Sequence, residues 1–300
     1  MTSALRQLIS AGHGDAIATI VRKEGHAYGK PGSRALYALD SARPLWGNIG
    51  SVCIDETVRL AVGRAVRSGT LEIVRIDTRD ESDVDFGYGT YCGGVSDVWV
   101  EPLTGEVRAR YTHALERVDA GLPVWIVYTL DPPRVTICTR EPGDTDAAWV
   151  DRIAPPMRLV IFGATPLAEH VIRVLDGLAL AVCVSDWRQH LVDAFDAHPC
   201  VALCNHEFPC DDSTLVLVMS HVTRRDVDAL QRALQCGCRW IGLLSSSGRR
   251  DYIFSLLAQD GVPKALLQTI SSPVGLDIGA RDDAEIAVAI AAELVQVMRR

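Results

Sequence analysis

Two cysteines in the N-terminal half stand in glycine-rich turns, where a thiol is suited to metal binding or nucleophilic chemistry. Cys53 lies in GNIGSVCIDETV, which leads into an amphipathic helix predicted over residues 54–68. Unpaired N–H groups at the start of a helix lower the pKa of a thiol and so favour the thiolate. Cys92 precedes Gly93 in a segment with four glycines, whose open backbone lets a ligand approach closely. The alternative is that both cysteines are packing residues.

A glycine turn in the C-terminal half predicts a phosphate site. LVIFGATPLAEHV places Gly163 directly after a buried strand and before a helix, where backbone N–H groups and the helix dipole bind phosphate. Gly163 and Ala168 fill the first and last positions of the dinucleotide fingerprint G-x-G-x-x-G/A, whereas Thr165 occupies the middle one. Asp186 ends the next predicted strand, where it can accept hydrogen bonds from a ribose. The alternative is a Rossmann-like sheet whose turn binds nothing.

His221 follows a third strand of the same predicted sheet, in VMSHVTRRDVDAL. Ligands of parallel sheets collect at the carboxyl ends of the strands, so His221 is a candidate to line the site. In the competing interpretation, Ser220 or Thr223 caps the following helix, and Asp226 pairs with one of the two arginines that precede it.

The other cysteines are weaker candidates for metal binding or catalysis. Nine cysteines, an odd number, are spread over a chain with 48% hydrophobic residues, which predicts free thiols rather than a disulfide scaffold. The spacing C-x3-C-x-H-x3-C from 200 to 210 is not that of a zinc knuckle, and its interleaved apolar residues favour incidental burial over metal binding. Cys236 and Cys238 flank Gly237, as expected where a helix ends.

The elements that must position these residues divide the chain into two halves. Short strands and one helix indicate an α+β domain over residues 1–150, and a polar, proline-bearing stretch at 141–156 predicts the boundary near residue 150. Apolar runs alternating with helices over residues 151–300 predict a Rossmann-like, doubly wound parallel sheet, so the fold class is α/β. The strands are predicted at 16–21, 35–39, 97–100, 124–128, 158–162, 180–185, 215–219 and 240–244, and the C-terminal helices at 167–175, 224–235, 249–259 and 283–298.

Composition excludes several classes of partner. The chain has 300 residues and a net charge of −8, so it offers no basic field for a nucleic-acid backbone or an anionic membrane. The first twenty residues contain no apolar stretch long enough for a signal peptide or a membrane span, and we expect a cytoplasmic protein.

Several segments together resemble the XdhC/CoxI family of molybdenum-enzyme accessory proteins, from about residue 16 to residue 296. The similar segments are ATIVRKEGHAYGKPGSRAL, GNIGSVCIDETV, YCGGVSDVWVEPL, LVIFGATPLAEHV, VMSHVTRRDVDAL, RWIGLLSSSGRR and SSPVGLDIGARDDAEIAVAIAAEL. The most specific is the last, which makes Gly275 and Asp277 candidate cofactor-binding residues. The sequence departs from the family pattern at Val52, Thr165 and Ser245, and at Arg281-Asp282-Asp283, where the family has a Thr-Pro type of helix start.

The resemblance implies a chaperone for the molybdenum cofactor, as molybdopterin or its cytosine dinucleotide. Such a protein protects the cofactor, supports its sulfuration and inserts it into a xanthine-dehydrogenase-like or aldehyde-oxidase-like apoenzyme, and it need not catalyse a reaction. Molybdenum that bears dithiolene sulfur is soft enough to accept a thiolate, so Cys53 or Cys92 would ligate the metal or shield its terminal sulfide. A molybdenum hydroxylase apoenzyme is the implied partner, with a cysteine desulfurase as a second one, and a homodimer is left open.

Two other functions compete with the chaperone. An NAD(P)-dependent oxidoreductase would use Gly163 and Asp186, although Thr165 argues against it. A module that binds no cofactor would instead dock a partner enzyme through the long C-terminal helix and an acidic surface. The chaperone hypothesis depends on a cleft between the two halves in which sulfur from the N-terminal turns faces the phosphate site after Gly163.

Overall fold

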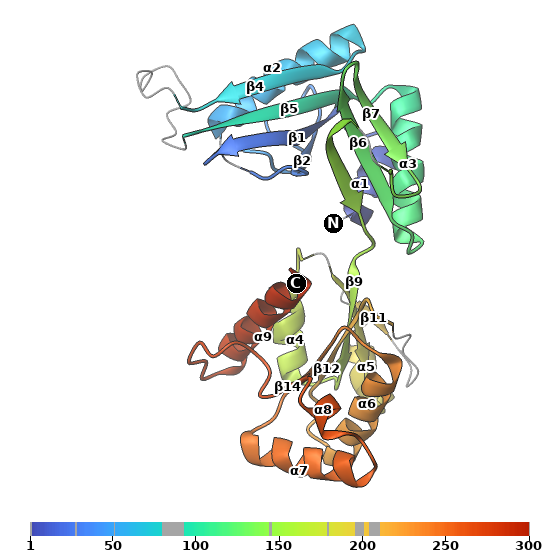
Figure 1. Ribbon diagram of the computed structural model, residues 1–300, viewed down its shortest axis with the longest axis vertical. Helices are drawn as coiled ribbons and strands as arrows, with labels where there is room; N and C mark the ends of the chain where they lie inside the picture. The colour runs from blue at the N-terminus through green and yellow to red at the C-terminus, as the bar shows by residue number, and fades with distance from the viewer. Residues whose placement is uncertain are drawn as a thin grey trace. The chain divides into compact units, whose positions relative to one another are not determined.

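The computed structural model describes residues 2–27, 29–50, 52–79, 93–143, 146–178, 180–195, 201–203 and 211–299. The chain divides into two compact units, Met1–Pro155 and Pro156–Arg300 (Figure 1). In the described parts of both units, no helix has the length and apolar character needed to cross a membrane.

An antiparallel five-stranded sheet forms the centre of the first unit, in the strand order β3-β2-β1-β5-β4. The long central pair aligns Ala16 of β1 with Pro102 of β5 at one end and Gly25 with Gly94 at the other. The strands span Ala16–Gly25 (β1), Arg34–Tyr37 (β2), Trp46–Gly47 (β3), Glu72–Asp77 (β4) and Gly94–Pro102 (β5).

The two faces of this sheet are buried by different partners. Because side chains alternate along a strand, Ile20 and Val98 pack against helix α2, whereas Ile17 and Trp99 face the opposite way. That second face packs with α1, α3 and a smaller antiparallel sheet of order β7-β6-β8 (Figure 1). These elements span Thr2–Ser10 (α1), Val52–Ser68 (α2), Gly105–Asp119 (α3), Val124–Leu130 (β6), Pro133–Cys138 (β7) and Ala147–Ile153 (β8).

Six parallel strands form the sheet of the second unit, in the order β11-β10-β9-β12-β13-β14. Counted along the chain this is the order 3-2-1-4-5-6 of the Rossmann fold, and it reverses between β9 and β12. The strands span Met157–Phe162 (β9), Leu180–Ser185 (β10), Val201–Leu203 (β11), Thr214–Val218 (β12), Trp240–Leu243 (β13) and Ile270–Ser271 (β14). The helices span Pro166–Leu175 (α4), Gln189–Val192 (α5), Thr223–Cys236 (α6), Ser247–Gln259 (α7), Lys264–Leu267 (α8) and Asp283–Met298 (α9), with a short 3₁₀ turn at Asp193–Phe195.

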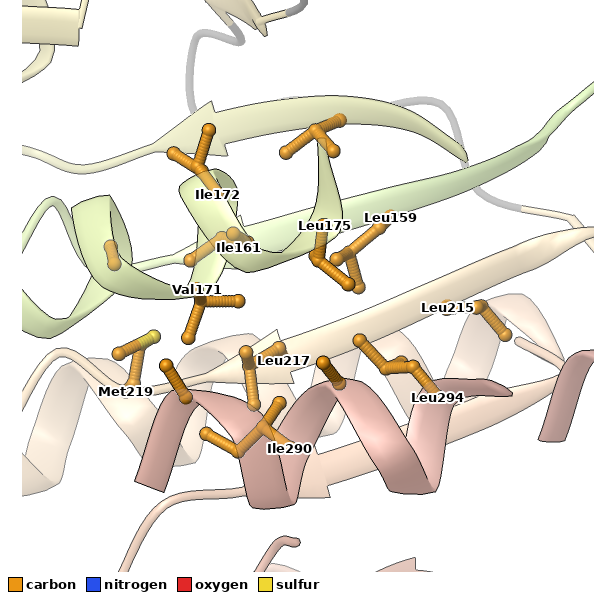
Figure 2. Packing of buried hydrophobic residues seen from close by; sticks show 14 of the residues in the cluster. Leu159, Ile161, Val171, Ile172, Leu175, Leu215, Leu217, Met219, Ile290 and Leu294 are labelled. Atoms are coloured by element: carbon orange, nitrogen blue, oxygen red, sulfur yellow. The ribbon is translucent and has the colours of Figure 1, made fainter. Parts of the chain in front are cut away.

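Both faces of the parallel sheet are covered. Leu159 and Ile161 of β9 join a buried cluster with α4 and α9, which lie side by side on one face (Figure 2). Val160 and Phe162 point to the other face and pack with residues of α6 and α7. Burial of one such aliphatic side chain stabilises the fold by about 1.5–3 kcal/mol. The predicted fold class, an α+β domain followed by a doubly wound parallel sheet, is confirmed.

One strand of the first unit lies where the sequence predicted a linker. β8 (Ala147–Ile153) runs through the polar stretch that the sequence had suggested as a boundary, and it pairs antiparallel with β6. Nearly all of its side chains are half-buried, so the strand has no apolar run of its own. The chain divides after Pro155, on the far side of this strand.

Candidate functional site

The turn after β9 and the turn after β12 touch at the point where the strand order reverses. Gly163 has a φ of +122°, and a Cβ atom at this position would lie 2.7 Å from the backbone nitrogen and Cα of Ser220. Its N–H donates to the carbonyl of Ser185 at the end of β10 (2.8 Å). The predicted glycine turn is therefore a close backbone contact among three strand ends, and a side chain at Gly163 would push them apart.

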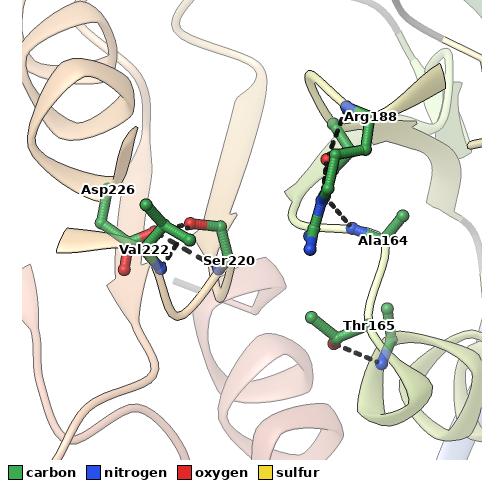
Figure 3. Close-up of polar contacts among 8 residues, drawn as sticks. Ala164, Thr165, Arg188, Ser220, Val222 and Asp226 are labelled. Carbon is green, nitrogen blue, oxygen red and sulfur yellow. Dashed lines mark hydrogen bonds and ion pairs between the residues drawn. The ribbon is translucent and has the colours of Figure 1, made fainter. Parts of the chain in front are cut away.

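Asp186 is fully engaged inside this edge of the sheet. Its side chain has no exposed surface, and it accepts the N–H of Ala164 at 2.9 Å on Oδ2 (Figure 3). Arg188 supplies three further donors, each at 2.9 Å: its backbone N–H and Nε to Oδ1, and Nη2 to Oδ2. Both carboxylate oxygens are thus occupied by the protein's own donors, including one from the glycine turn.

This pairing shifts both ionisation equilibria. Burial alone would raise the pKa of Asp186, but the hydrogen bonds from Arg188 and Ala164 outweigh it and hold that pKa below its ordinary value. Hydrogen bonding to Asp186 in turn raises the pKa of Arg188. The carboxylate and the guanidinium are therefore a charged pair at neutral pH.

Thr165 caps helix α4 rather than leaving its first turn open. The Thr165 hydroxyl accepts the N–H of Ala168 (3.3 Å), and Pro166, which has no N–H, occupies the first turn as predicted. The amide of Ala164 is bound by Asp186, so two backbone donors near this turn already have side-chain acceptors. A ligand at this turn would have to displace these contacts or use side-chain donors nearby.

A buried polar group holds the turn after β12. Asp226 is completely buried and accepts hydrogen bonds from the Ser220 hydroxyl and, at 2.5 Å, from Arg249 of α7. The Ser220 hydroxyl accepts the N–H of Val222 at 3.2 Å (Figure 3). The expected pairing of Asp226 with a neighbouring arginine of its own helix is wrong, because the carboxylate points into the interior toward another helix. No side chain caps α6, whose N-cap residue is Val222.

His221 is exposed between these contacts. It has a φ of +61° and is the one non-glycine residue with positive φ in the ranges that the structure describes. Such a conformation is unfavourable by about 1–3 kcal/mol and persists only when its surroundings enforce it. Here the Ser220 hydroxyl binds both Asp226 and the N–H of Val222, so the backbone at His221 is held at the carboxyl edge, where the carboxyl ends of the parallel strands lie.

The segment that contains Gly275 and Asp277 is held by Glu293, away from the contacts described above. Glu293 of α9 accepts the N–H of Gly275 (2.6 Å), the hydroxyl of Ser271 (2.5 Å) and the indole N–H of Trp240 (3.1 Å). Gly275 has a φ of +102°, which favours glycine, and Asp277 is exposed in the loop that follows. Glu293 thus anchors the segment after β14, and neither predicted residue contacts the Gly163 turn through a described hydrogen bond.

Only the backbone of Cys53 is described. It lies in the first turn of α2, which begins at Val52, whereas the sequence predicted a turn at Cys53 and a helix from residue 54. Two residues further on, Asp55 accepts a hydrogen bond from Tyr37 of β2. Burial, together with this bond, raises the pKa of Tyr37, so the phenol stays protonated and donates. The contact fixes the start of α2 against the sheet. Cys92 lies outside the described residues, and Gly93 follows it with a φ of +58° at the start of the segment leading into β5.

The other cysteines divide into two groups. Cys138 and Cys236 are free thiols, and Gly237 ends α6 in the left-handed conformation, as predicted. The expectation of free thiols is wrong for Cys183 of β10, which is disulfide-bonded. Among the described residues no group of three or more His, Cys, Asp or Glu side chains is arranged for a metal ion. The run from Cys200 to Cys210 lies largely outside them.

Sequence reasoning missed an aromatic and two arginines at the carboxyl edge. Trp187 follows Asp186 and packs near Phe162, with ring centroids 6.4 Å apart. The Arg188 guanidinium carbon lies 4.3 Å from the Trp187 ring centroid, and that of Arg225 lies 5.5 Å from it. Asp-Trp-Arg directly after a buried strand was the available signal, but the approach of Arg225 follows only from the strand order.

Two stretches of this chain match known families in the order found along the sequence. Residues 8–77 match the family described as "XdhC and CoxI family", and residues 159–294 match the "XdhC Rossmann domain". The chain belongs to the XdhC/CoxI family. The first match contains Cys53 and its helix, and the second contains the carboxyl edge of the parallel sheet.

Individual relatives were also found. The chain is 26% identical to a probable xanthine dehydrogenase subunit of Bacillus subtilis (strain 168), over 95% of this chain and 93% of that protein. It is 31% identical to "Uncharacterized protein YqeB" of Escherichia coli (strain K12), but over only 27% of this chain and 15% of that protein. A crystal structure described as a xanthine dehydrogenase from Bacillus halodurans has the same fold, with a TM-score of 0.85 and 22% identity over 99% of this chain and 96% of that one.

Proposed function

We propose that this XdhC/CoxI-family protein is a chaperone that binds the molybdenum cofactor, protects it during sulfuration and delivers it to a xanthine-dehydrogenase-like or aldehyde-oxidase-like apoenzyme. The cofactor is its cargo, and binding and release are its whole function. The apoenzyme and a cysteine desulfurase that supplies sulfur are its protein partners.

The position of Cys53 in the first turn of α2 carries the proposal. A helix N-terminus lowers the pKa of a thiol and increases the thiolate fraction at neutral pH. The contact between Tyr37 and Asp55 fixes this turn on the five-stranded sheet, so the backbone at Cys53 is held by a rigid scaffold. A thiolate is a suitable ligand for molybdenum that already carries dithiolene sulfur. Cys92 would be the alternative thiolate ligand.

The carboxyl edge of the parallel sheet suits the phosphate end of the cofactor. His221 is exposed there, and Arg188 and Arg225 supply cationic side chains on the same edge. These side-chain donors matter because the backbone donors of Ala164 and Ala168 are already bound. Gly163 contributes by keeping the two turns close enough to form one surface.

The alternative of an NAD(P)-dependent oxidoreductase has weaker support. In Rossmann folds that bind a nicotinamide cofactor, an acidic residue at the end of the second strand accepts hydrogen bonds from the ribose hydroxyls of the cofactor. Asp186 occupies that position, but its carboxylate is buried and already accepts four N–H donors. Thr165, in place of the middle glycine, adds a side chain at the turn.

Copurification tests the proposal against its competitors. The full chain is purified from cells that make molybdenum cofactor, and the eluate is assayed for molybdenum by mass spectrometry and for pterin by fluorescence. We expect both to be retained near one per chain and to be lost in Cys53→Ala. Cys138→Ala, which removes a free thiol of the same unit, is the matched control and should retain them. Retention of NAD(H) without pterin would support the oxidoreductase instead, and retention of neither would support the docking module.

A further inference from the structure

Two arginines from different elements each contact one aromatic ring at the carboxyl edge of the parallel sheet. Arg188 follows β10 and Arg225 lies in the first turn of α6, after β12. Their guanidinium carbons lie 4.3 and 5.5 Å from the centroid of the Trp187 ring. Trp187 is half-buried and packs against the core of the α6 face, so both cations contact a ring that is held in place.

Arg188 is pre-organised by the pair that it forms with Asp186. Two guanidinium nitrogens bind the two carboxylate oxygens, and the plane lies over Trp187. The side chain is still 34% exposed, so part of the guanidinium faces solvent. A guanidinium that is already held in place loses little conformational entropy when it binds a further anion.

Arg225 is the unneutralised cation of the cluster. Its guanidinium forms no hydrogen bond or ion pair in the described part of the chain, and the adjacent carboxylate of Asp226 points inward to Arg249. The preceding Arg224 pairs along the helix with Asp228 (3.3 Å). Asp186, Arg188 and Arg225 together therefore carry one net positive charge, on a protein whose net charge is −8. The net positive charge of the cluster favours the binding of an anion.

We propose that Arg188 and Arg225 bind a phosphomonoester, the phosphate end of the ligand that lies along this edge toward His221. A phosphomonoester carries about two negative charges at neutral pH and three acceptor oxygens. It can therefore accept from the guanidinium of Arg225 and from the N–H groups of Arg188 that Asp186 leaves free, and it has more charge than a carboxylate or a phosphodiester. The inference rests on the proposed function, because molybdopterin ends in such a phosphate. The 2′-phosphate of NADP offers the same chemistry.

Paired ligands that differ only in the phosphate test the proposal. The full chain is titrated with oxidised fluorescent molybdopterin derivative and its dephosphorylated form, and separately with NADP+ and NAD+. We expect the phosphorylated member of at least one pair to bind about tenfold more tightly, as one or two charge-assisted hydrogen bonds imply. Inorganic phosphate should compete. Arg225→Gln should abolish the preference, Arg225→Lys should restore part of it, and Arg224→Gln should leave it unchanged.

The outcomes separate this proposal from the proposed function. A preference for the phosphorylated pterin supports both. A preference for NADP+ with no pterin binding supports the phosphomonoester site and contradicts the cofactor chaperone. Equal affinities within both pairs, or a preference that survives in Arg225→Gln, overturn the phosphomonoester site even if molybdenum still copurifies with the chain. Arg225 is exposed and has no described hydrogen bond, so its replacement should leave the fold intact, which circular dichroism checks.

Discussion

The carboxylate of Asp186 lies 2.9 Å from the backbone nitrogen of Ala164, so the acidic residue after β10 binds the glycine turn after β9. In a dinucleotide-binding sheet the corresponding residue is open to a ribose. Here the same position braces the turn, and Arg188 covers what remains of the carboxylate. The carboxyl edge is thus built around an internal ion pair, with cations rather than an acidic group facing outward.

Replacing Asp186 by Asn tests this brace. The change removes the charge that pairs with Arg188 and puts an NH2 group among N–H donors, so we expect the free energy of unfolding to fall by about 1–3 kcal/mol. Urea unfolding measures the difference. Glu169→Gln, which removes the carboxylate of an exposed pair with Arg173, is the control and should change it by less than about 0.5 kcal/mol. A similar small effect for Asp186→Asn would contradict the structural role.

The lowered pKa of Asp186 gives the same variant a pH signature. A carboxyl group with a depressed pKa in the folded state stabilises the fold above its unfolded pKa, which is about 3.9, and this stabilisation is lost as the pH falls through the folded value. The difference in unfolding free energy between the native chain and Asp186→Asn should therefore be constant near neutrality and shrink below about pH 4. A difference that grows on acidification would have the wrong sign.

Glu101 should show the opposite pH dependence. Burial raises its pKa above the ordinary 4.5, and the ion pair with Arg110 only partly offsets this. A raised pKa means that the stabilising contribution is present at low pH and is lost as the pH rises through the folded value. We expect Glu101→Gln to lessen the fall in unfolding free energy between pH 4 and pH 7. Parallel pH curves for the two proteins would show that Glu101 has no such shift.

Gly163→Ala tests the contact between the two turns. The added Cβ would lie 2.7 Å from backbone atoms of Ser220, in addition to the strain of a positive φ. Gly177→Ala is a matched control, because Gly177 also has a positive φ (+83°) but nothing within 4 Å of its Cβ position. Strain alone costs about 1–2 kcal/mol. Thermal unfolding should therefore show a distinctly larger loss for Gly163→Ala, and equal losses would exclude the close contact.

Asp226→Ala should be among the most damaging single changes in the second unit. It leaves Arg249 without its buried carboxylate and the Ser220 hydroxyl without its acceptor, and breaking such a buried pair costs about 3–5 kcal/mol. Asp228→Ala, on the same helix and in an exposed pair with Arg224, should change the free energy of unfolding by less than about 1 kcal/mol. Denaturant unfolding that ranks the two variants equally would contradict the internal role of Asp226.

The C-terminal sheet was predictable because its signals are local. The four central strands are continuous apolar runs that alternate with helices, and Asp283–Met298 was predicted with the bounds that the structure gives it. The two-residue edge strand β14 has no such run and was not predicted. Helix α3 was missed, although Thr104 caps it and its buried residues recur at helical spacing. β8 was missed for a physical reason, since a strand with half-buried side chains lacks an apolar run and resembles a linker.

The site was less predictable than the fold. Gly163, Thr165 and Asp186 were identified from their spacing, but their hydrogen bonds were not, because donors and acceptors pair through the folded backbone. Trp187 and Arg225 are 38 positions apart in the sequence, and they come together only because β10 and β12 flank β9. Predicting this contact requires knowledge of the strand order, and no local sequence pattern gives that order.

Transfer of cofactor to a client enzyme tests the central claim most directly. The purified chain, loaded with molybdenum cofactor, is mixed with a molybdenum hydroxylase apoenzyme, and the recovered hydroxylase activity and protein-bound molybdenum are followed over time. We predict that the loaded chain restores activity faster and more completely than free cofactor does, and that Cys53→Ala does not whereas Cys138→Ala does. Equal activation with and without the chain, or full activity with Cys53→Ala, would contradict the account.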